Sequence, residues 1–353
     1  GVSVALGAGA GSAEGEPETS GENEDLVELK RSLTQKEHFD QDFQLGGMLG
    51  EGGFAKVHTA KHRGTDLEVA VKVIDIAKYN MFTRGNLRES QLKDEIKIHH
   101  ELQHPNVVHL VWWYESRRHL HIILEKVNGG DLFDYLVAHC TTGMGLNEAH
   151  ARKWFNDLLK AVEYMHNNGV VHRDLKPENI LLSQPNENAT LKISDFGLAK
   201  VNQSGAACQT KCGTINYMAP EVAVSGPSAP RMYGKEADLW GLGVILHVMV
   251  SLTMPFEGEE QETEAMLVKM ANGGKRVVPG LLAGECWNDR SPELKHLLKH
   301  LLTPDYKKRA TLKDAFDSPW VKGEESAEMR TPTKRQAANE DAGPGGSAKK
   351  RAR

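Results

Sequence analysis

The stretch from Val171 to Asn179 constrains the fold of this chain more than any other feature of the sequence. It reads Val-His-Arg-Asp-Leu-Lys-Pro-Glu-Asn and places a carboxylate at Asp174, an ammonium group at Lys176 and an amide at Asn179. Sixteen residues later, Asp195 opens the sequence Asp-Phe-Gly, which is typical of a turn. A carboxylate can accept a proton from a hydroxyl, an ammonium group can neutralise a phosphoryl group, and carboxylate and amide oxygens suit magnesium. These residue types at this spacing predict a site for phosphoryl transfer.

The composition is that of an ordinary soluble globular protein, with 353 residues of which 39% are hydrophobic and 26% charged. This length suggests two or three domain-sized units. The net charge of -5 argues against a surface that coats nucleic acid, so no nucleic-acid partner is expected. The four cysteines form no Cys-x-x-Cys pair, which argues against a zinc site or a disulfide framework. No apolar stretch reaches the ~18–20 residues of a membrane span, so no membrane partner is expected.

The character of the sequence changes along the chain. Residues 1–42 are rich in Gly, Ala, Ser and Glu, and we expect this acidic segment to be disordered. Residues 43–127 contain short runs typical of strands, and residues 128–322 show helical spacing. We therefore predict an α+β fold with a small β-rich N-terminal lobe, a larger helical C-terminal lobe and a cleft between them. Residues 323–353 form a polar, basic tail that we also expect to be disordered.

The individual elements follow from periodicity and from breaks at glycine or charged residues. The predicted strands are 43–48, 55–60, 67–74, 107–113 and 120–124. The predicted helices are 91–102, 151–166, 237–251, 262–271, 291–302 and 312–317. Asn147 is a suitable N-cap for the second helix, and the helix 237–251 is apolar nearly all round, which predicts that it is fully buried.

A glycine-rich segment lies between the first two predicted strands. Residues 49–57 read Leu-Gly-Glu-Gly-Gly-Phe-Ala-Lys-Val, and glycines let backbone N–H groups approach phosphate oxygens closely. A plain hairpin is the alternative explanation of such a loop. The segment lacks the Gly-Lys-Ser/Thr of a Walker loop, and a strand rather than a helix follows, which disfavours a Rossmann fold.

Lys72 ends the run Val-Ala-Val-Lys on the third predicted strand, 22 residues after Gly50. A lysine with apolar neighbours on both sides is expected to be partly buried, and it then needs a counter-charge. The alternative is a surface lysine that buries its stem and keeps its ammonium group in water.

Taken together, these segments are similar to the eukaryotic protein kinases over residues 43–322. Glu95, nine residues before His104, matches the helix glutamate that pairs with the strand lysine in that family. The positions that match the family's active site in register are Lys72, Glu95, Asp174, Asn179 and Asp195. This complete set disfavours a catalytically inactive kinase-fold scaffold, which remains the alternative. Lys176, two residues after Asp174, resembles serine/threonine kinases more than tyrosine kinases.

The resemblance implies ATP and Mg²⁺ as cofactors. Lys72 would hold the α- and β-phosphates, Asp174 would accept the proton of the substrate hydroxyl, and Lys176 would neutralise the transferring phosphoryl group. The implied metal ligands are Asn179 and Asp195. The implied nucleotide-binding positions are Leu49, Gly50, Glu51, Gly52, Gly53, Phe54, Ala55, Val57, Ala70, Lys72, Glu125, Val127, Asp131, Asn179 and Asp195. Ala55 replaces the third glycine of the family's loop, so we expect a slightly stiffer loop that still binds ATP.

The resemblance extends to the segment between Asp195 and Glu221, which ends in Met-Ala-Pro-Glu. Thr210 is at the family's activating phosphosite, and Arg173, which precedes Asp174, can bind a phosphate there. Thr214 resembles the residue that contacts the substrate near the catalytic loop. Phosphorylation of Thr210 by an upstream kinase or by a second copy of the chain would order the segment.

Two further motifs resemble the calcium/calmodulin-dependent kinase group, namely Asn-Gly-Gly-Asp-Leu-Phe at residues 128–133 and Lys-Pro-Glu-Asn at residues 176–179. In that group Asp131 and Glu178 face the substrate channel and favour basic residues before the acceptor. Within the group the chain is similar to the checkpoint kinase two subfamily, which implies a signalling role in DNA damage. A calmodulin-regulated relative is the alternative, although the tail after residue 322 has no basic amphipathic helix.

The tail carries two basic clusters, Lys334-Arg335 and Lys349-Lys350-Arg351, separated by 13 residues. Such spacing is typical of a bipartite nuclear import signal, and a solvated basic terminus is the alternative. We expect the protein to act in the nucleus, or otherwise in the cytoplasm, on protein substrates.

Overall fold

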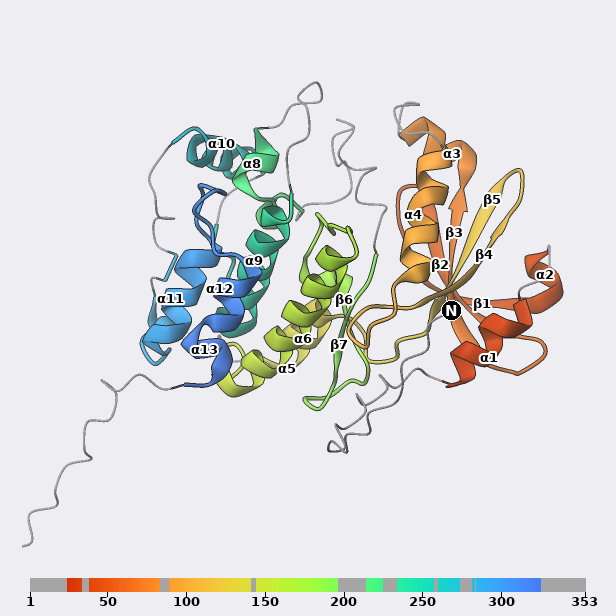
Figure 1. The fold of residues 1–353 in the computed structure, drawn as a ribbon, viewed down its shortest axis with the longest axis horizontal. Helices are drawn as coiled ribbons and strands as arrows, with labels where there is room; N and C mark the ends of the chain where they lie inside the picture. Colours follow the sequence, from red (N-terminus) through yellow and green to blue (C-terminus); the bar gives the residue numbers. More distant parts are fainter. Residues whose placement is uncertain are drawn as a thin grey trace, which may run out of the picture.

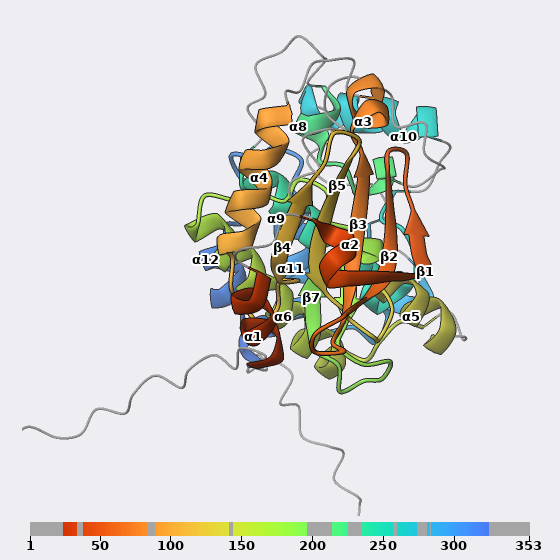
Figure 2. The ribbon, with the colours of Figure 1, turned by 90° about the vertical axis from the view of Figure 1, so that its right-hand side faces the viewer.

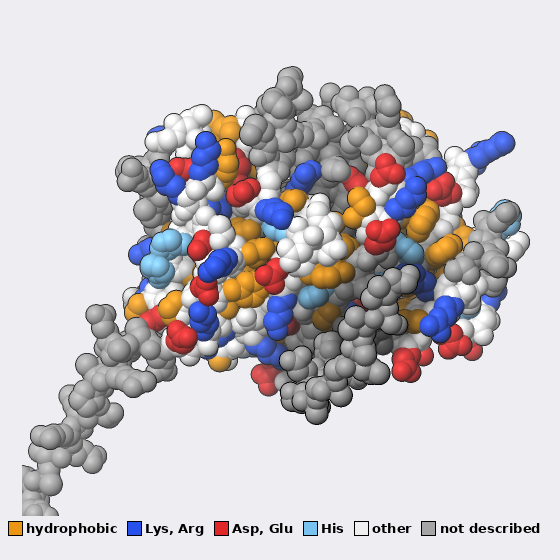
Figure 3. All heavy atoms as spheres, viewed as in Figure 1, with side chains coloured by type: hydrophobic (Ala, Val, Ile, Leu, Met, Phe, Trp, Pro, Cys, Tyr) orange, Lys and Arg blue, Asp and Glu red, His pale blue; other side chains and the backbone are white. Residues whose placement is uncertain are grey.

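The computed structural model has a small lobe built on a β-sheet and a larger helical lobe, which lie on the right and the left of Figure 1. The structure describes residues 24–33, 38–82, 89–140, 144–195, 214–224, 234–256, 260–273, 281–282 and 284–324. The predicted α+β, two-lobed architecture is confirmed. On the face seen in Figure 3, side chains of both signs are interspersed over the two lobes.

The small lobe is a five-stranded antiparallel sheet in the order β1-β2-β3-β5-β4. Its strands are β1 (Phe43–Glu51), β2 (Ala55–His62), β3 (Glu68–Asp75), β4 (Leu110–Glu115) and β5 (His119–Glu125). All five predicted strands are present with small shifts at their ends. The predicted helix in this lobe is α4 (Glu89–Glu101), which lies beside the sheet in Figure 2 and buries Leu92 and Ile96 against it. A short helix that was not predicted, α3 (Ile76–Phe82), connects β3 toward α4.

Our expectation that residues 1–42 are disordered is wrong for two stretches, which form α1 (Glu24–Leu33) and α2 (Phe39–Asp42). Leucines at positions 26, 29 and 33 have the i, i+3, i+7 spacing of one helix face, and all three are buried. They pack with Phe39, Phe43 and residues of β3, β4 and β5 in one apolar cluster. The prediction of disorder was based on the Glu-rich composition of the whole segment. This average does not reveal the row of leucines, because the acidic residues lie on the other faces of the helix.

Shortening Leu29 to alanine is expected to lower the free energy of unfolding by about 2–3 kcal/mol, because the side chain is fully buried and its loss leaves a cavity. Leu45→Ala is the matched control, since that leucine is 44% exposed. Urea denaturation followed by circular dichroism measures both. A similar small loss for the two variants would contradict the packing of α1.

The larger lobe is organised around α9 (Glu236–Ser251), in which nearly every residue is buried, as its apolar sequence predicts. Asn147 caps α6 (Glu148–Asn167) through a bond of 2.9 Å from the His150 N–H to its side-chain oxygen, which confirms the predicted cap. The structure also describes in this lobe the helices α5 (Leu132–His139), α8 (Pro220–Ala223), α10 (Glu260–Ala271), α11 (Pro292–Leu301), α12 (Leu312–Asp317) and α13 (Pro319–Lys322). No helix in the described part of the chain is long and apolar enough to cross a membrane.

The described part of the larger lobe also contains three 3-10 turns and a small hairpin. These elements are η1 (Pro177–Asn179), β6 (Ile180–Leu182), β7 (Leu191–Ile193), η2 (Thr214–Tyr217) and η3 (Glu285–Trp287). Strand β7 joins the two lobes, because the Ile193 N–H donates to the Asn106 carbonyl and the Val108 N–H donates to the Ile193 carbonyl, both at 2.9 Å. The chain that leads from β7 to Asp195 is therefore fixed to both lobes.

Candidate active site

The loop that carries Asp174 is held by a buried carboxylate of α9. Asp238 is 1% exposed and accepts bonds from the His172 N–H at 2.9 Å and the Arg173 N–H at 2.7 Å. Nε2 of His166 lies 2.7 Å from the same carboxylate. Arg173 has a φ of +68°, which is unfavourable for a residue with a side chain, so this anchoring offsets a strained backbone.

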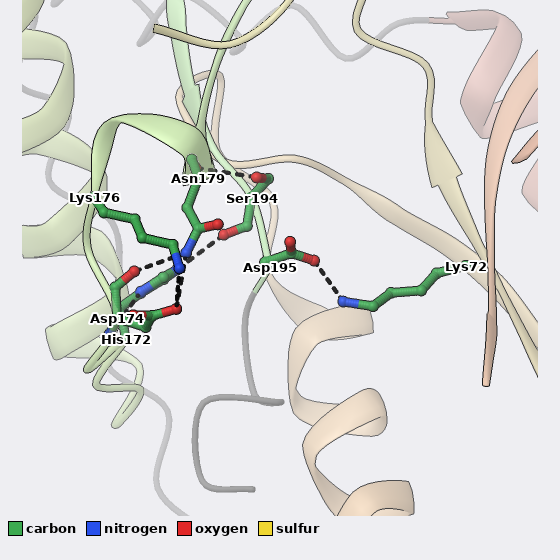
Figure 4. Close-up of polar contacts among 7 residues, drawn as sticks. All are labelled: Lys72, His172, Asp174, Lys176, Asn179, Ser194 and Asp195. Atoms are coloured by element: carbon green, nitrogen blue, oxygen red, sulfur yellow. Dashed lines mark hydrogen bonds and ion pairs between the residues drawn. The ribbon is translucent and has the colours of Figure 1, made fainter. Parts of the chain in front are cut away.

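Within the loop, the side chains of Lys176 and Asn179 both reach Asp174, as Figure 4 shows. Nζ of Lys176 lies 3.2 Å from Oδ2 of Asp174. The Asn179 side-chain amide donates to the Asp174 carbonyl at 2.8 Å and to Oδ2 at 3.2 Å. Because the amide nitrogen of Asn179 is used in this way, its amide oxygen is the atom that could coordinate a metal ion.

Ser194 connects this loop to the second acid. Its N–H and its hydroxyl both donate to the Asn179 carbonyl, at 2.8 and 3.0 Å, and its carbonyl lies 2.8 Å from Nε2 of His172. Asp195 follows directly, so its position relative to Asp174 is set by short bonds between the two segments (Figure 4).

Asp195 forms an ion pair with Lys72, whose Nζ lies 2.5 Å from Oδ1. The positive charge of Lys72 holds the pKa of the Asp195 carboxyl below its usual value. The backbone of Asp195 has a φ of +60°. The Lys72 side chain is only 12% exposed, which agrees with the prediction of a partly buried lysine with a counter-charge. The residues that follow Asp195 in the predicted turn lie outside the described part of the chain.

Glu95 lies in the same small cavity as these two residues. The cavity is lined by Lys72, Glu95 and Asp195 together with apolar residues of α4 and the sheet, including Leu92 and Ile122. The predicted lysine and glutamate, 23 positions apart in the sequence, are thus brought to one site. Three charged groups beside an apolar wall form a site whose ionic interactions are stronger than in water.

The glycine-rich segment forms the turn between β1 and β2. The Gly52 N–H donates to the Ala55 carbonyl at 2.8 Å, and no atom lies within 4 Å of the place where a Cβ on Gly50 would stand. The turn residues Leu49, Glu51, Gly52 and Gly53 are exposed, whereas Gly50, Phe54, Ala55 and Val57 are half-buried. The loop therefore keeps open space beside its backbone, which a phosphate-binding loop requires.

Glu125 and Asp131, which were predicted to bind the nucleotide near the connection between the lobes, also form contacts within the protein. The Glu125 carboxylate pairs with Lys192 of β7 at 2.7 Å, and the Asp131 carboxylate accepts a bond of 2.9 Å from the Asp134 N–H as the N-cap of α5. Burial raises the pKa of the Asp131 carboxyl above its usual value. Ala70 and Val127 are half-buried, and Glu178 is exposed.

Comparison with known proteins agrees with this geometry, since residues 43–321 match the family model of the protein kinase domain. The chain belongs to the protein kinase family. It is 36% identical over 285 residues to the "Probable serine/threonine-protein kinase fhkC" of Dictyostelium discoideum, 37% over 287 residues to a calcium/calmodulin-dependent protein kinase type 1 of Macrobrachium nipponense, and 36% over 283 residues to a human SNF-related serine/threonine-protein kinase.

These alignments cover 81%, 80% and 80% of this chain, and 45%, 76% and 34% of the three relatives. The chain thus spans less than half the length of the first and third relatives. What is common to all of them is a serine/threonine protein kinase domain, and this chain carries one.

The kinase domain has a further ion pair, between Arg309 and Glu221, away from the nucleotide loop. The Arg309 guanidinium, whose side chain is fully buried, binds both oxygens of Glu221 at 2.7 and 2.8 Å and lies over the Trp240 ring. Thr214 begins η2, seven residues before Glu221, while Thr210 lies outside the described residues.

Sequence reasoning gave no role to three residues that position this site. Asp238 anchors the catalytic loop, Ser194 joins that loop to Asp195, and Lys192 pairs with Glu125 between the lobes. An acid in an almost wholly apolar helix was a signal for Asp238, because a buried charge needs polar partners. The sequence around Ser194 and Lys192 carries no comparable signal.

Proposed function

We propose that this chain transfers the γ-phosphoryl group of Mg-ATP to serine or threonine hydroxyls of proteins. The observation that carries the proposal is the network in which Asp174, Lys176 and Asn179 meet within 3.2 Å. A catalytically inactive scaffold is the second candidate, but it gives no reason for these groups to converge beside the Lys72–Asp195 pair.

The donor set fits the two cofactors. Amide and carboxylate oxygens are hard ligands, so Asn179 and Asp195 would hold magnesium, which neutralises phosphate charge when bound. Lys72, on β3, would hold the phosphates under the exposed glycine-rich turn. Asp174 would orient the acceptor hydroxyl and take its proton, and Lys176 would stabilise the charge on the transferring group.

The substrates we propose carry basic residues before the acceptor. Glu178 is exposed two residues after Lys176, and it presents a carboxylate next to the catalytic network. Asp131 uses one carboxylate oxygen to cap helix α5, so its other carboxylate oxygen would bind a basic residue of the substrate. An arginine guanidinium suits both positions because it binds carboxylates through paired hydrogen bonds.

The substrate preference is tested with an Arg-x-x-Ser peptide and its Arg→Ala twin. We compare kcat/KM for the arginine peptide with kcat/KM for the alanine peptide. We expect Glu178→Gln to reduce this ratio by about tenfold, which corresponds to the loss of one charge-assisted contact of ~1.4 kcal/mol. Glu187→Gln, at an exposed turn, is the matched control and should leave the ratio unchanged. An unchanged ratio in Glu178→Gln would contradict the role of Glu178.

Regulation by phosphorylation is supported by Arg173. Its Nε is buried and has no hydrogen-bond partner among the described residues, so a phosphate on Thr210 could supply one. This arrangement would suit a member of the checkpoint kinase two subfamily activated by an upstream kinase or a second copy. Equal activity of Thr210→Ala and the fully phosphorylated wild type would rule it out.

Two finer proposals concern the pathway and the place of action. A DNA-damage signalling role would agree with nuclear import through Lys334-Arg335 and Lys349–Arg351, which lie outside the described residues. The similarity to a calcium/calmodulin-dependent kinase favours the alternative, a calmodulin-regulated enzyme. Fusion of residues 323–353 to a fluorescent protein tests import directly, since a fusion that stays out of the nucleus would contradict it.

A further inference from the structure

Helix α3 places a buried tyrosine, Tyr79, between the glycine-rich turn and helix α4. The helix is anchored at its start, because the Asp75 carboxylate accepts the Lys78 N–H at 3.0 Å and the Ile76 N–H donates to the Arg118 carbonyl at 3.0 Å. Tyr79, in the middle of the helix, is 1% exposed. A tyrosine buried to this extent packs its ring against neighbouring elements of the small lobe.

On one side, Tyr79 contacts the glycine-rich turn. Its ring and that of Phe54 pack edge to face, with 5.5 Å between centroids and an angle of 79°. The Phe54 carbonyl also accepts the Asp75 N–H at 3.0 Å, one residue before α3 begins. A backbone bond and a ring contact therefore tie the tip of the turn to the region around α3.

On the other side, Tyr79 faces α4. It shares an apolar cluster with Leu92 and Ile96, the residues that flank Glu95 on the inner face of that helix. Burial and the negative charge of Glu95 raise the pKa of the Tyr79 hydroxyl to about 12. The hydroxyl thus stays protonated at neutral pH, and the ring lies between the turn and the helix that carries Glu95.

We propose that Tyr79 is a positioning residue that joins the glycine-rich turn to the apolar face of α4, so that the affinity of the turn for a nucleotide depends on the contact between Phe54 and Tyr79. The inference rests on the proposed nucleotide-binding function of the turn. An aromatic ring that contacts both parts favours the arrangement in which Phe54 is held inward and α4 is packed on the sheet.

The test is a double-mutant cycle on Phe54 and Tyr79, read as the Kd for Mg-ADP by calorimetry. We expect Tyr79→Leu and Phe54→Leu each to weaken binding about 3–10-fold, the effect expected if the full contribution of one aromatic pair is lost from the nucleotide-binding form. The double variant should bind no more weakly than the weaker single variant, because both substitutions remove the same contact. Tyr79→Phe retains the ring and should bind as the wild type does.

Tyr114→Leu is the matched control for general destabilisation. Tyr114 is also buried in the small lobe, at 4% exposure, but its hydroxyl donates to Asp42 and its ring packs away from the turn, in the cluster with α1. This variant should unfold at a lower temperature with an unchanged Kd. Two outcomes would overturn the coupling. The first is a double variant whose Kd rises by the product of the two single fold-changes, because such substitutions act independently. The second is a raised Kd in Tyr114→Leu. A wild type that binds no Mg-ADP would instead show that the proposed function itself is wrong.

Discussion

Replacement of Asp174 by asparagine is expected to lower the turnover number for peptide phosphorylation by about 10²–10⁴-fold, the usual worth of a positioned general base. Asparagine has the same shape and its oxygen can still accept from Lys176 and from the Asn179 amide. The loop should therefore keep its geometry, while the group that takes the hydroxyl proton is lost. We expect the Kd for Mg-ADP to stay within about twofold of the wild-type value, since Asp174 does not contact the nucleotide in this account.

The matched control is Asp289→Asn, an exposed position in the larger lobe. Steady-state kinetics should show wild-type turnover for this variant. A turnover number within twofold of wild type for Asp174→Asn would exclude Asp174 as the base. Loss of nucleotide binding along with turnover would show that the substitution disturbs the loop instead.

Replacement of Arg309 by leucine is expected to lower the free energy of unfolding by about 3–5 kcal/mol, because it removes a fully buried guanidinium that binds both oxygens of the half-buried Glu221 carboxylate. The carbonyls of Thr303 and Glu236, which accept from Arg309 at 3.0 and 2.7 Å, would lose a donor as well. Chemical denaturation measures the effect. Arg117→Leu, at an exposed turn, should change stability by less than about 0.5 kcal/mol.

The double variant Arg309→Leu, Glu221→Leu separates the loss of the ion pair from the effect of leaving the Glu221 charge without Arg309. It removes the unpaired charge together with the pair, so it should be more stable than Arg309→Leu alone. A single variant as stable as the Arg117→Leu control would show that the ion pair is not important for folding. A double variant less stable than the single one would indicate that Glu221 has another essential partner.

The elements that sequence analysis predicted well are those with a strong and long pattern. Helix α9 is apolar over nearly its whole length, and α6 begins at an asparagine with a clear stripe behind it, so both were found. Helix α5 has only eight residues, and its cap, Asp131, was interpreted as a substrate-binding residue. Three leucines in an acidic segment were too few to predict α1 before their burial against the sheet was known.

In the active site, contacts between residues close in sequence were predictable, whereas contacts between distant residues were not. The catalytic loop is local in sequence, so the approach of Lys176 and Asn179 to Asp174 follows from a few residues of backbone. The Lys72–Asp195 pair joins residues 123 positions apart, and only the packing of the two lobes brings them together. The sequence predicted that Lys72 needs a counter-charge, but spacing alone could not indicate that Asp195 also provides one.

The most direct test of the account is transfer of phosphate from Mg-ATP to an Arg-x-x-Ser peptide by the wild-type chain, with Asp174→Asn measured beside it. The reaction should be run before and after treatment with an activating kinase. We predict phosphoserine that appears with the wild type, requires magnesium and is lost in the variant. No transfer by the wild type, even with Thr210 fully phosphorylated, would contradict the kinase function and favour an inactive kinase-fold scaffold.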